Sequence, residues 1–163
     1  MDSFAIAKYL DKNFPDTPSL FPNRSEAFCV LVTDHMMSRI AIVLFPLLLP
    51  RIIALLDDRG AEYFRRTREE AFGFKISEDI YSNKEQVDAI WNQARQPLGV
   101  LDSMLKERPE GPFFLGTERG YADCIVLAVL KMFKRCGEQD IYEKVVEMAP
   151  ELRKLWDACS DIL

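Results

Sequence analysis

Apolar side chains recur at helical spacing along most of this 163-residue chain. In residues 4–13, for example, Phe4, Ala7 and Leu10 fall on one side of a helix. Strand-like alternation of apolar and polar residues between turn signals is absent from the sequence. The pattern therefore predicts an all-α fold. Its helices are expected at residues 4–13, 23–57, 61–72, 82–107, 121–136, 140–148 and 151–160.

Polar residues mark where several of these helices should begin. Asn23 precedes Glu26 by three residues, which is the spacing of a capping box, where the two side chains bond free amides of the first turn. Ser82 and Glu85 repeat this spacing before a later long helix. The Asp-Arg-Gly run at residues 58–60 is expected to separate the first long helix from the next one.

Proline and glycine divide the pattern further. Residues 14–23 carry three prolines and should form an irregular connector after the first helix. Pro46, Pro50 and Pro97 lie inside predicted helices, and we expect each to bend its helix because proline lacks a backbone donor and crowds the preceding turn. Gly137 is expected to end the helix that begins at residue 121.

The segment at residues 111–131, GPFFLGTERGYADCIVLAVLK, combines a turn, a helix cap and a strongly apolar helix. Gly120 is in position to be the N-cap of this helix, and Asp123 falls at N3, where a carboxylate bonds free amides of the first turn. Residues 124–133 are apolar on all sides. We therefore expect this helix to lie in the centre of the domain, with Asp123 in a structural role.

Charge and composition narrow the functional classes. The net charge of −5 is spread along the chain without a basic stripe, which argues against nucleic acid as a partner. The four cysteines lack CxxC spacing and the chain has one histidine, so no metal site is expected. Reduced, buried thiols are typical of a cytoplasmic protein, which is the localisation that we predict.

Residues 40–56 form the most apolar run of the chain. The run has 17 residues, with Pro46, Pro50 and Arg51 inside it, whereas a membrane-spanning helix needs about 20 apolar residues. A kinked helix buried in a bundle accounts for this pattern better. We therefore expect no membrane partner.

Several of these stretches together resemble a known family. The FFLG…YAD motif at residues 113–123 is similar to the core-helix signature of the C-terminal all-helical domain of the glutathione S-transferase superfamily. Residues 2–22, 55–73 and 152–156 resemble further parts of the same family, and the second of these resembles its etherase-related branch. The resemblance implies a glutathione transferase C-terminal-like helical bundle with one extra N-terminal helix.

The resemblance also implies a division of the chain and an incomplete site. Residues 1–22 correspond to the last helix of a thioredoxin-like domain plus a linker, and residues 23–163 to the helical domain. In the family an acidic residue and a serine, here Asp2 and Ser3, hold the γ-glutamyl end of glutathione. The thioredoxin-like unit that carries the catalytic residue of the family has no counterpart before Asp2.

This difference leads to an expectation about assembly. In the family the first helix packs on the thioredoxin-like sheet, so here its apolar face must be covered by the bundle or by a second chain. We expect a homodimer. Another departure is Gly120, where the family usually has Ser or Thr, and glycine caps a helix almost as well.

The first long helix contains a polar stripe within an apolar sequence. Asp34, His35, Ser38 and Arg39 are contiguous on its surface, and Leu31 lies on the neighbouring face. One interpretation makes His35 the acid or base of a catalytic group, with Asp34 and Arg39 orienting it and Ser38 and Leu31 contacting substrate. The alternative is a solvated or self-paired stripe without a function.

Two further sites are candidates for substrate contacts. Tyr63 and Arg66 belong to a cluster of aromatic and basic residues that suits a carboxylate or phosphate, although an exposed amphipathic face explains it as well. Tyr121, at the start of the core helix, either reaches a pocket or is a packed tyrosine with a bonded hydroxyl.

Three functional hypotheses remain open at this point. The first is an enzyme that binds a hydrophobic small molecule and catalyses a glutathione-independent isomerisation, cyclisation or elimination in secondary metabolism, without a cofactor. The second is an etherase-type glutathione transferase fragment or subunit that uses glutathione and needs a thioredoxin-like partner. The third is a non-catalytic binding or scaffold module.

Overall fold

The computed structural model describes residues 3–107, 110–136 and 140–161. Within these ranges the chain is all-α, as predicted, and its β-structure is limited to two isolated bridges in the loop around Leu115. Two short 3-10 turns lie at Pro22–Arg24 and Ile80–Ser82, and a π-helical segment, η2, spans His35–Ala41. The α-helices are α1 (Ser3–Asn13), α2 (Glu26–Asp34), α3 (Ile42–Ala54), α4 (Asp58–Phe72), α5 (Lys84–Lys106), α6 (Tyr121–Cys136), α7 (Asp140–Met148) and α8 (Pro150–Ala158).

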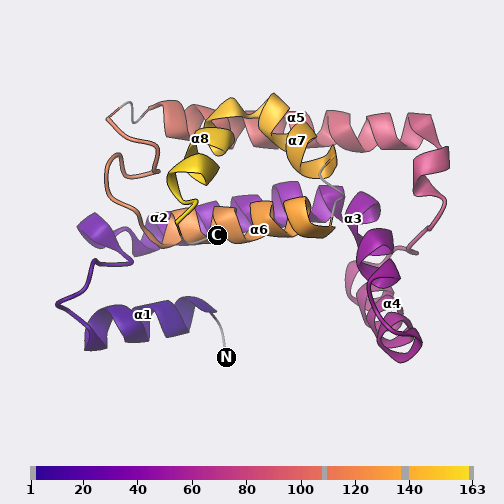
Figure 1. Ribbon diagram of the computed structural model, residues 1–163, viewed down its shortest axis with the longest axis horizontal. Coiled ribbons are helices and arrows are strands. Elements are labelled where there is room, and N and C mark those ends of the chain that lie inside the picture. Colours follow the sequence, from indigo (N-terminus) through magenta and orange to yellow (C-terminus); the bar gives the residue numbers. More distant parts are fainter. Residues whose placement is uncertain (1–2, 108–109, 137–139, 162–163) are drawn as a thin grey trace.

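The helices form a bundle with two extensions. In Figure 1, α5 runs beside α7 and α8 on one side, while α6 lies along the continuous helix formed by α2, η2 and α3 on the other. Helix α6 contacts α2, η2, α3, α7 and α8, so it is central, as predicted. Its outer side is nevertheless exposed at Ala128 and Lys131, so the expectation of burial on all sides is wrong. Helices α1 and α4 both project from the same side of the bundle.

Both predicted capping boxes are wrong. Helix α5 begins at Lys84, because Asn83 rather than Ser82 accepts a hydrogen bond from the Gln86 amide through its side chain, at 3.1 Å. Asn23 lies in a 3-10 turn with a left-handed φ of 55°, and α2 begins three residues later without a side-chain cap. Adjacent polar residues compete for the same amides, and the spacing alone does not decide which of them wins.

The predicted separation between the first long helix and the next one also shifts. Asp57 is the N-cap of α4, and its Oδ1 accepts a hydrogen bond from the Gly60 amide at 2.6 Å. Residues 58–60 are therefore the first turn of α4. Gly73 ends this helix with a φ of 71°, a conformation that glycine adopts without strain. The predicted stop at Gly137 lies outside the described residues.

The first long helix is distorted before its prolines. The chain remains α-helical through Pro46 and Pro50. The change of helix type lies at His35–Ala41, where the Ile42 amide bonds the Met37 carbonyl five residues back. A π-helical turn holds more residues than an α-turn, so side chains in this segment point in other directions than α-helical spacing predicts.

The predicted role of Asp123 in starting the core helix is confirmed. Its carboxylate accepts hydrogen bonds from the Gly120 amide at 2.8 Å and from the Phe114 amide at 3.0 Å, and its side chain is fully buried. Burial raises the pKa of this carboxyl, and this effect exceeds that of the hydrogen bonds from the Phe114 and Gly120 amides, which lower the pKa. A Cβ at Gly120 would lie 3.3 Å from Pro22, which explains why glycine suits this position.

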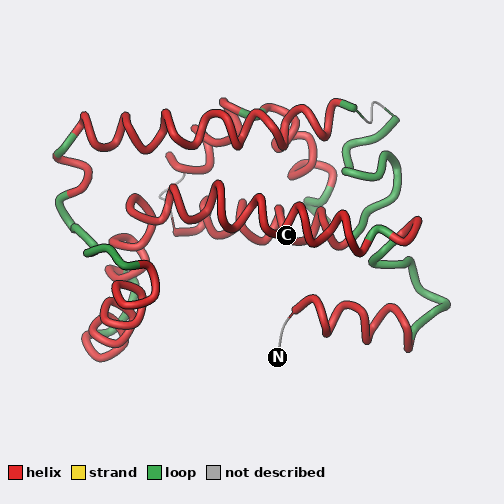
Figure 2. The backbone as a smooth tube through the Cα atoms, turned by 180° about the vertical axis from the view of Figure 1, so that it is seen from behind, coloured by secondary structure: helices red, strands yellow, loops and turns green. Residues whose placement is uncertain are grey.

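Tyr121 attaches the N-terminal segment to the core helix. Its amide donates to the Leu20 carbonyl at 2.7 Å, and its ring packs against the rings of Phe4 and Phe21, with centroids 5.7 and 5.5 Å away. Helix α1 buries only Ala7 and stands apart from the bundle along most of its length (Figure 2). Its outer apolar side chains, Ile6, Tyr9, Leu10 and, just beyond it, Phe14, stay exposed in the single chain.

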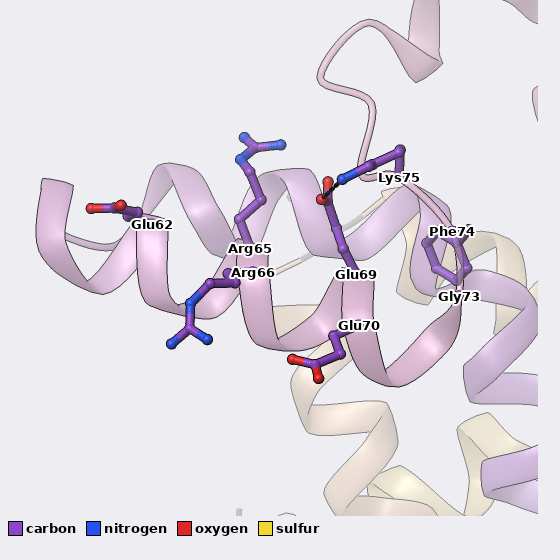
Figure 3. Close-up of a pocket in the computed structure, with 8 residues that line it drawn as sticks. All are labelled: Glu62, Arg65, Arg66, Glu69, Glu70, Gly73, Phe74 and Lys75. Carbon is purple, nitrogen blue, oxygen red and sulfur yellow. Dashed lines mark hydrogen bonds and ion pairs between the residues drawn. The ribbon is translucent and has the colours of Figure 1, made fainter.

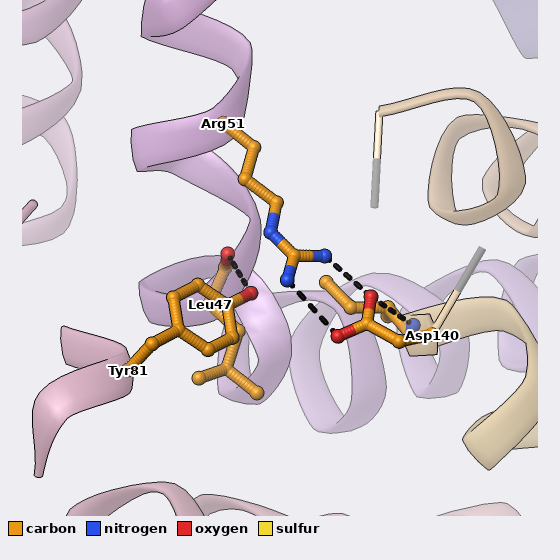
Figure 4. A network of polar contacts seen from close by, with 5 residues as sticks. Leu47, Arg51, Tyr81 and Asp140 are labelled. Carbon is orange, nitrogen blue, oxygen red and sulfur yellow. Dashed lines mark hydrogen bonds and ion pairs between the residues drawn. The ribbon is translucent and has the colours of Figure 1, made fainter. Parts of the chain in front are cut away.

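A second set of polar contacts joins α3 to the C-terminal helices. Arg51 donates two hydrogen bonds to Asp140, at 2.5 and 2.9 Å, and its guanidinium lies 4.3 Å from the ring centre of Tyr81 (Figure 4). The Tyr81 hydroxyl in turn donates to the Leu47 carbonyl at 2.7 Å. Arg51 holds the pKa of Asp140 below its usual range.

The continuous helix Glu26–Ala54 is long and apolar enough to cross a membrane by length and composition. Half of its most apolar window is buried inside the bundle. Core helices of soluble proteins share these properties, so this helix is weak evidence for a membrane span.

Replacing Asp123 by Ala leaves two amides without their acceptor, and we expect it to lower the free energy of unfolding by about 3 kcal/mol. Urea denaturation followed by circular dichroism measures this. The matched control is Asp157→Ala, an exposed carboxylate on α8, which should change stability by less than about 0.5 kcal/mol. Equal stability of the two variants would contradict the structural role of Asp123.

The Arg51–Asp140 pair should make stability depend on pH. Because the folded-state pKa of Asp140 is lowered, its contribution is complete above the unfolded pKa of about 3.8 and disappears as the pH falls through the folded pKa. The stability difference between the wild type and Asp140→Asn should therefore shrink between neutral pH and about pH 3. Glu143→Gln, at the more exposed pair with Arg153, serves as the control. A difference that stays constant with pH would rule out this linkage.

Candidate functional site

A cavity of about 370 Å³ opens where α1, α2, the start of η2 and α6 meet. Its walls are partly apolar, and polar side chains lie at two places along it. The lining residues are Ser3, Phe4, Val30, Thr33, Asp34, Met37, Ser38 and Tyr121. The cavity thus combines four predicted site residues from distant parts of the sequence: Ser3, Asp34, Ser38 and Tyr121.

One polar place is the pair formed by Tyr121 and Ser3. The Tyr121 hydroxyl donates to the Ser3 Oγ atom at 3.0 Å. Tyr121 is buried and held by its neighbours, whereas Ser3 is exposed at the N-terminal end of α1. Since Ser3 accepts in this bond, its own hydroxyl hydrogen can be donated to a ligand. Asp2, the other predicted glutathione contact, lies outside the described residues.

The other polar place is the pair formed by Asp34 and Ser38. The Ser38 hydroxyl donates to Asp34 Oδ1 at 3.1 Å. Both residues belong to the junction of α2 and the π-helical segment, and π-helical turns within α-helices occur frequently at functional sites. Met37, between them in sequence, adds an apolar contact to the same cavity.

The structure does not bring His35 and Arg39 into this cavity. His35 points toward α5, where its Nε2 atom lies 2.8 Å from the carbonyl oxygen of the buried Pro97. A carbonyl only accepts hydrogen bonds, so Nε2 carries the hydrogen here. Arg39 is exposed and does not line the cavity. The polar stripe of the sequence is therefore divided, with Asp34 and Ser38 on one side and His35 on the other.

The other predicted substrate contacts also lie away from the cavity. Leu31 is 69% exposed on the surface of α2. Tyr63 and Arg66 are on α4, where the guanidinium lies 5.7 Å from the ring centre of Tyr63. Arg66 lines a groove of about 510 Å³ along α4, drawn in Figure 3.

Half of the charged side chains that line this α4 groove are in ion pairs. Lys75 pairs with Glu69 at 2.7 Å, and Arg65 pairs with Glu78. The groove is lined by three acidic and three basic side chains, which agrees with an amphipathic surface held by local ion pairs. This composition favours the structural interpretation of the basic cluster over an anion site.

Three of the cysteines have properties unlike those of activated nucleophiles. Burial raises the pKa of Cys29, Cys124 and Cys159, which disfavours the reactive thiolate. All four cysteines are free. Cys29 and Cys159 thus behave as small apolar side chains of the core, and Cys124 is a partly buried thiol.

Four residues of the cavity lining were not among the predicted site residues: Phe4, Val30, Thr33 and Met37. Val30, Thr33 and Met37 follow one another at three- and four-residue intervals with Asp34 and Ser38 beside them, so they share one helix face. That spacing was available in the sequence. Which face turns toward α1 and α6 was not, because that depends on how these helices pack against one another.

The fold and the cavity define a helical domain with a partly apolar cavity beside the N-terminal end of its first helix. The family described as "Glutathione S-transferase, C-terminal domain" matches residues 27–161. This chain belongs to that family. The resemblance noted in the sequence is thereby confirmed at the level of the family.

Individual relatives agree with this assignment. The chain is 38% identical to the glutathione S-transferase-like protein ustS of Aspergillus flavus, over 97% of this chain and 59% of that protein. It superposes on the glutathione S-transferase CsGST83044 of Ceriporiopsis subvermispora, solved in complex with glutathione, with a TM-score of 0.84 and 29% identity, over 99% of this chain and 66% of that one. Glutathione transferase GSTFuA2 of Phanerochaete chrysosporium gives a TM-score of 0.80 at 26% identity, over 98% of this chain and 64% of its own.

The chain thus spans about three fifths of the length of ustS and about two thirds of each of the two transferases. The described helices correspond to a part of these longer proteins.

Tyr121→Phe should loosen α1 without disturbing the core. The variant keeps the ring contacts and loses the hydrogen bond to Ser3, so we expect amides of α1 to exchange with solvent about two- to tenfold faster. Hydrogen–deuterium exchange read by mass spectrometry measures this. Tyr9→Phe, at an exposed tyrosine on α1 itself, is the control and should leave exchange unchanged. Equal exchange of α1 in both variants would show that the hydroxyl contributes nothing to its docking.

Proposed function

We propose that this chain supplies the apolar-substrate half of a glutathione transferase site. The cavity between α1, α2 and α6 takes a hydrophobic small molecule, and Ser3 binds the γ-glutamyl end of glutathione at its edge. The observation that carries this proposal is the hydrogen bond between Ser3 and Tyr121, which brings the family's glutathione-contacting serine to the mouth of an apolar cavity. The similarity to a transferase solved with glutathione supports the same role.

The other half of the site would come from a thioredoxin-like unit. Residues 1–22 then act as the last helix of that unit and its linker, and the exposed side chains Ile6, Tyr9 and Leu10 provide apolar surface for the contact. The greater length of ustS and of the solved transferases leaves room for such a unit. A second copy of this chain, in a homodimer, is the other candidate for covering this face, and we place the protein in the cytoplasm.

A second candidate is the glutathione-independent isomerisation, cyclisation or elimination of a secondary metabolite. The specific observation in its favour is the Asp34 carboxylate, which borders the apolar cavity with Ser38 as its hydrogen-bond donor. A carboxylate so placed can remove or return a proton of a bound molecule. In this reading Asp34 carries the acid–base role, because His35 faces Pro97 on α5. A purely scaffolding role lacks a comparable observation.

Filling the cavity tests the shared basis of both candidates. Val30→Trp adds bulk to the cavity wall, and we expect it to weaken the binding of 1-anilinonaphthalene-8-sulfonate, an anionic fluorescent probe with an apolar aromatic body, at least about tenfold. The control is Leu31→Trp, at the next residue, which is more exposed and lies outside the cavity lining. Absence of probe binding, or equal binding by both variants, would refute the cavity as the ligand site.

Glutathione separates the two candidates. If Ser3 belongs to a glutathione site, titration calorimetry should detect binding in about the millimolar range, because only part of the site is present, and Ser3→Ala should weaken it. Retained probe binding without any glutathione binding favours the second candidate over the first.

A further inference from the structure

We propose that the cavity selects apolar molecules that carry a hydroxyl group, with Asp34 accepting the hydrogen of that group. This inference rests on the proposed function of the cavity as a ligand site and adds the chemical class of the ligand. Its basis is the pattern of hydrogen-bond donors and acceptors that the lining residues leave free.

The Asp34 carboxylate has acceptor capacity that the protein does not use. Ser38 donates to Oδ1, and within residues 3–107, 110–136 and 140–161 no further hydrogen bond or ion pair to this carboxylate is found. An ionised carboxylate is an acceptor only, with room for about four hydrogen bonds. Its Oδ2 atom is therefore available to a donor on a ligand.

The surroundings of Asp34 determine which kind of donor fits. Val30 and Met37 lie on the same helix face, one turn before and one turn after it, and Phe4 faces them from α1. Asp34, Val30 and Met37 are exposed, so the carboxylate stands at the rim of the cavity beside an apolar wall. A ligand that lies on this wall with an apolar body and carries a hydroxyl, such as a phenol or an alcohol, uses both the wall and the free Oδ2 atom.

The second polar place of the cavity, formed by Tyr121 and Ser3, provides a hydrogen-bond donor, whereas Asp34 provides an acceptor. Tyr121 donates to Ser3, which leaves the hydroxyl hydrogen of Ser3 available for donation to a ligand. A ligand hydroxyl that must donate therefore finds its best partner at Asp34, and an acceptor group finds its best partner at Ser3. With about 370 Å³, the cavity lies near the lower end of the usual range for ligand pockets, which suits a body of about two fused rings.

A matched pair of ligands tests the inference. 1-Naphthol and 1-methoxynaphthalene share their ring system, and only the first can donate a hydrogen bond. We expect the wild-type chain to bind 1-naphthol about three- to tenfold more tightly, and Asp34→Asn, which keeps the size of the side chain, to reduce this preference to about twofold or less. Fluorescence or calorimetric titration of both ligands measures the ratio.

Two further variants make the test specific. Ser38→Ala frees Oδ1 without removing the carboxylate, so it should keep or increase the preference. Asp88→Asn, at an exposed acidic residue of α5, is the matched control and should keep the wild-type ratio. Loss of the preference in Asp88→Asn, or its persistence in Asp34→Asn, would overturn the assignment to Asp34.

The outcomes distinguish this inference from the proposed function. If both naphthalenes bind, if Val30→Trp weakens both, and if no preference for 1-naphthol is seen, the cavity is a ligand site and the hydroxyl selectivity is wrong. If the cationic 1-naphthylmethylamine binds more tightly than 1-naphthol, the site selects a positive charge over a neutral hydroxyl, and the inference is again wrong. If neither naphthalene binds, the proposed function fails and the inference fails with it.

Discussion

The arrangement of this chain depends on one buried carboxylate at the start of the core helix. Asp123 binds the amides of Gly120 and Phe114, so it fixes both the first turn of α6 and the loop before it. That turn contains Tyr121, whose amide donates a hydrogen bond to the Leu20 carbonyl and whose hydroxyl donates one to Ser3. The ring of Tyr121 packs against the rings of Phe4 and Phe21. A single desolvated acid therefore sets the position of α1 relative to the bundle, and α1 supplies one wall of the cavity.

The π-helical segment is the second constraint on the cavity. It follows α2 directly and lies within the polar stripe. In this stripe Asp34 and Ser38 line the cavity, whereas His35 contacts α5. A polar group in a mostly apolar helix needs a partner, and each of these residues finds one. For His35 the partner is a backbone carbonyl. For Asp34 the partner found among the described residues is the Ser38 hydroxyl, which leaves the second carboxylate oxygen open toward the cavity.

Much of the fold could be predicted from the sequence, because the information is local. Helical periodicity gave the all-α fold, and the FFLG…YAD motif gave the family, the central helix and the role of Asp123. The errors are local as well. Asn83 instead of Ser82 caps α5, and Asp57 caps α4 one turn earlier than expected. At such sites neighbouring polar residues compete for the same amides, and energies of a fraction of a kcal/mol decide between them.

The sequence by itself determined which residues form helices, which residue starts the core helix, and which family the chain belongs to. Spacing within one helix also indicated that Asp34 and Ser38 are neighbours. Only the tertiary structure decided that these two residues meet Ser3 and Tyr121 at one cavity, while His35 turns to Pro97. The physical reason is that a cavity is formed by surfaces from α1, α2 and α6 together. Their relative placement depends on long-range packing and on a π-helical turn, neither of which has a periodic signature in the sequence.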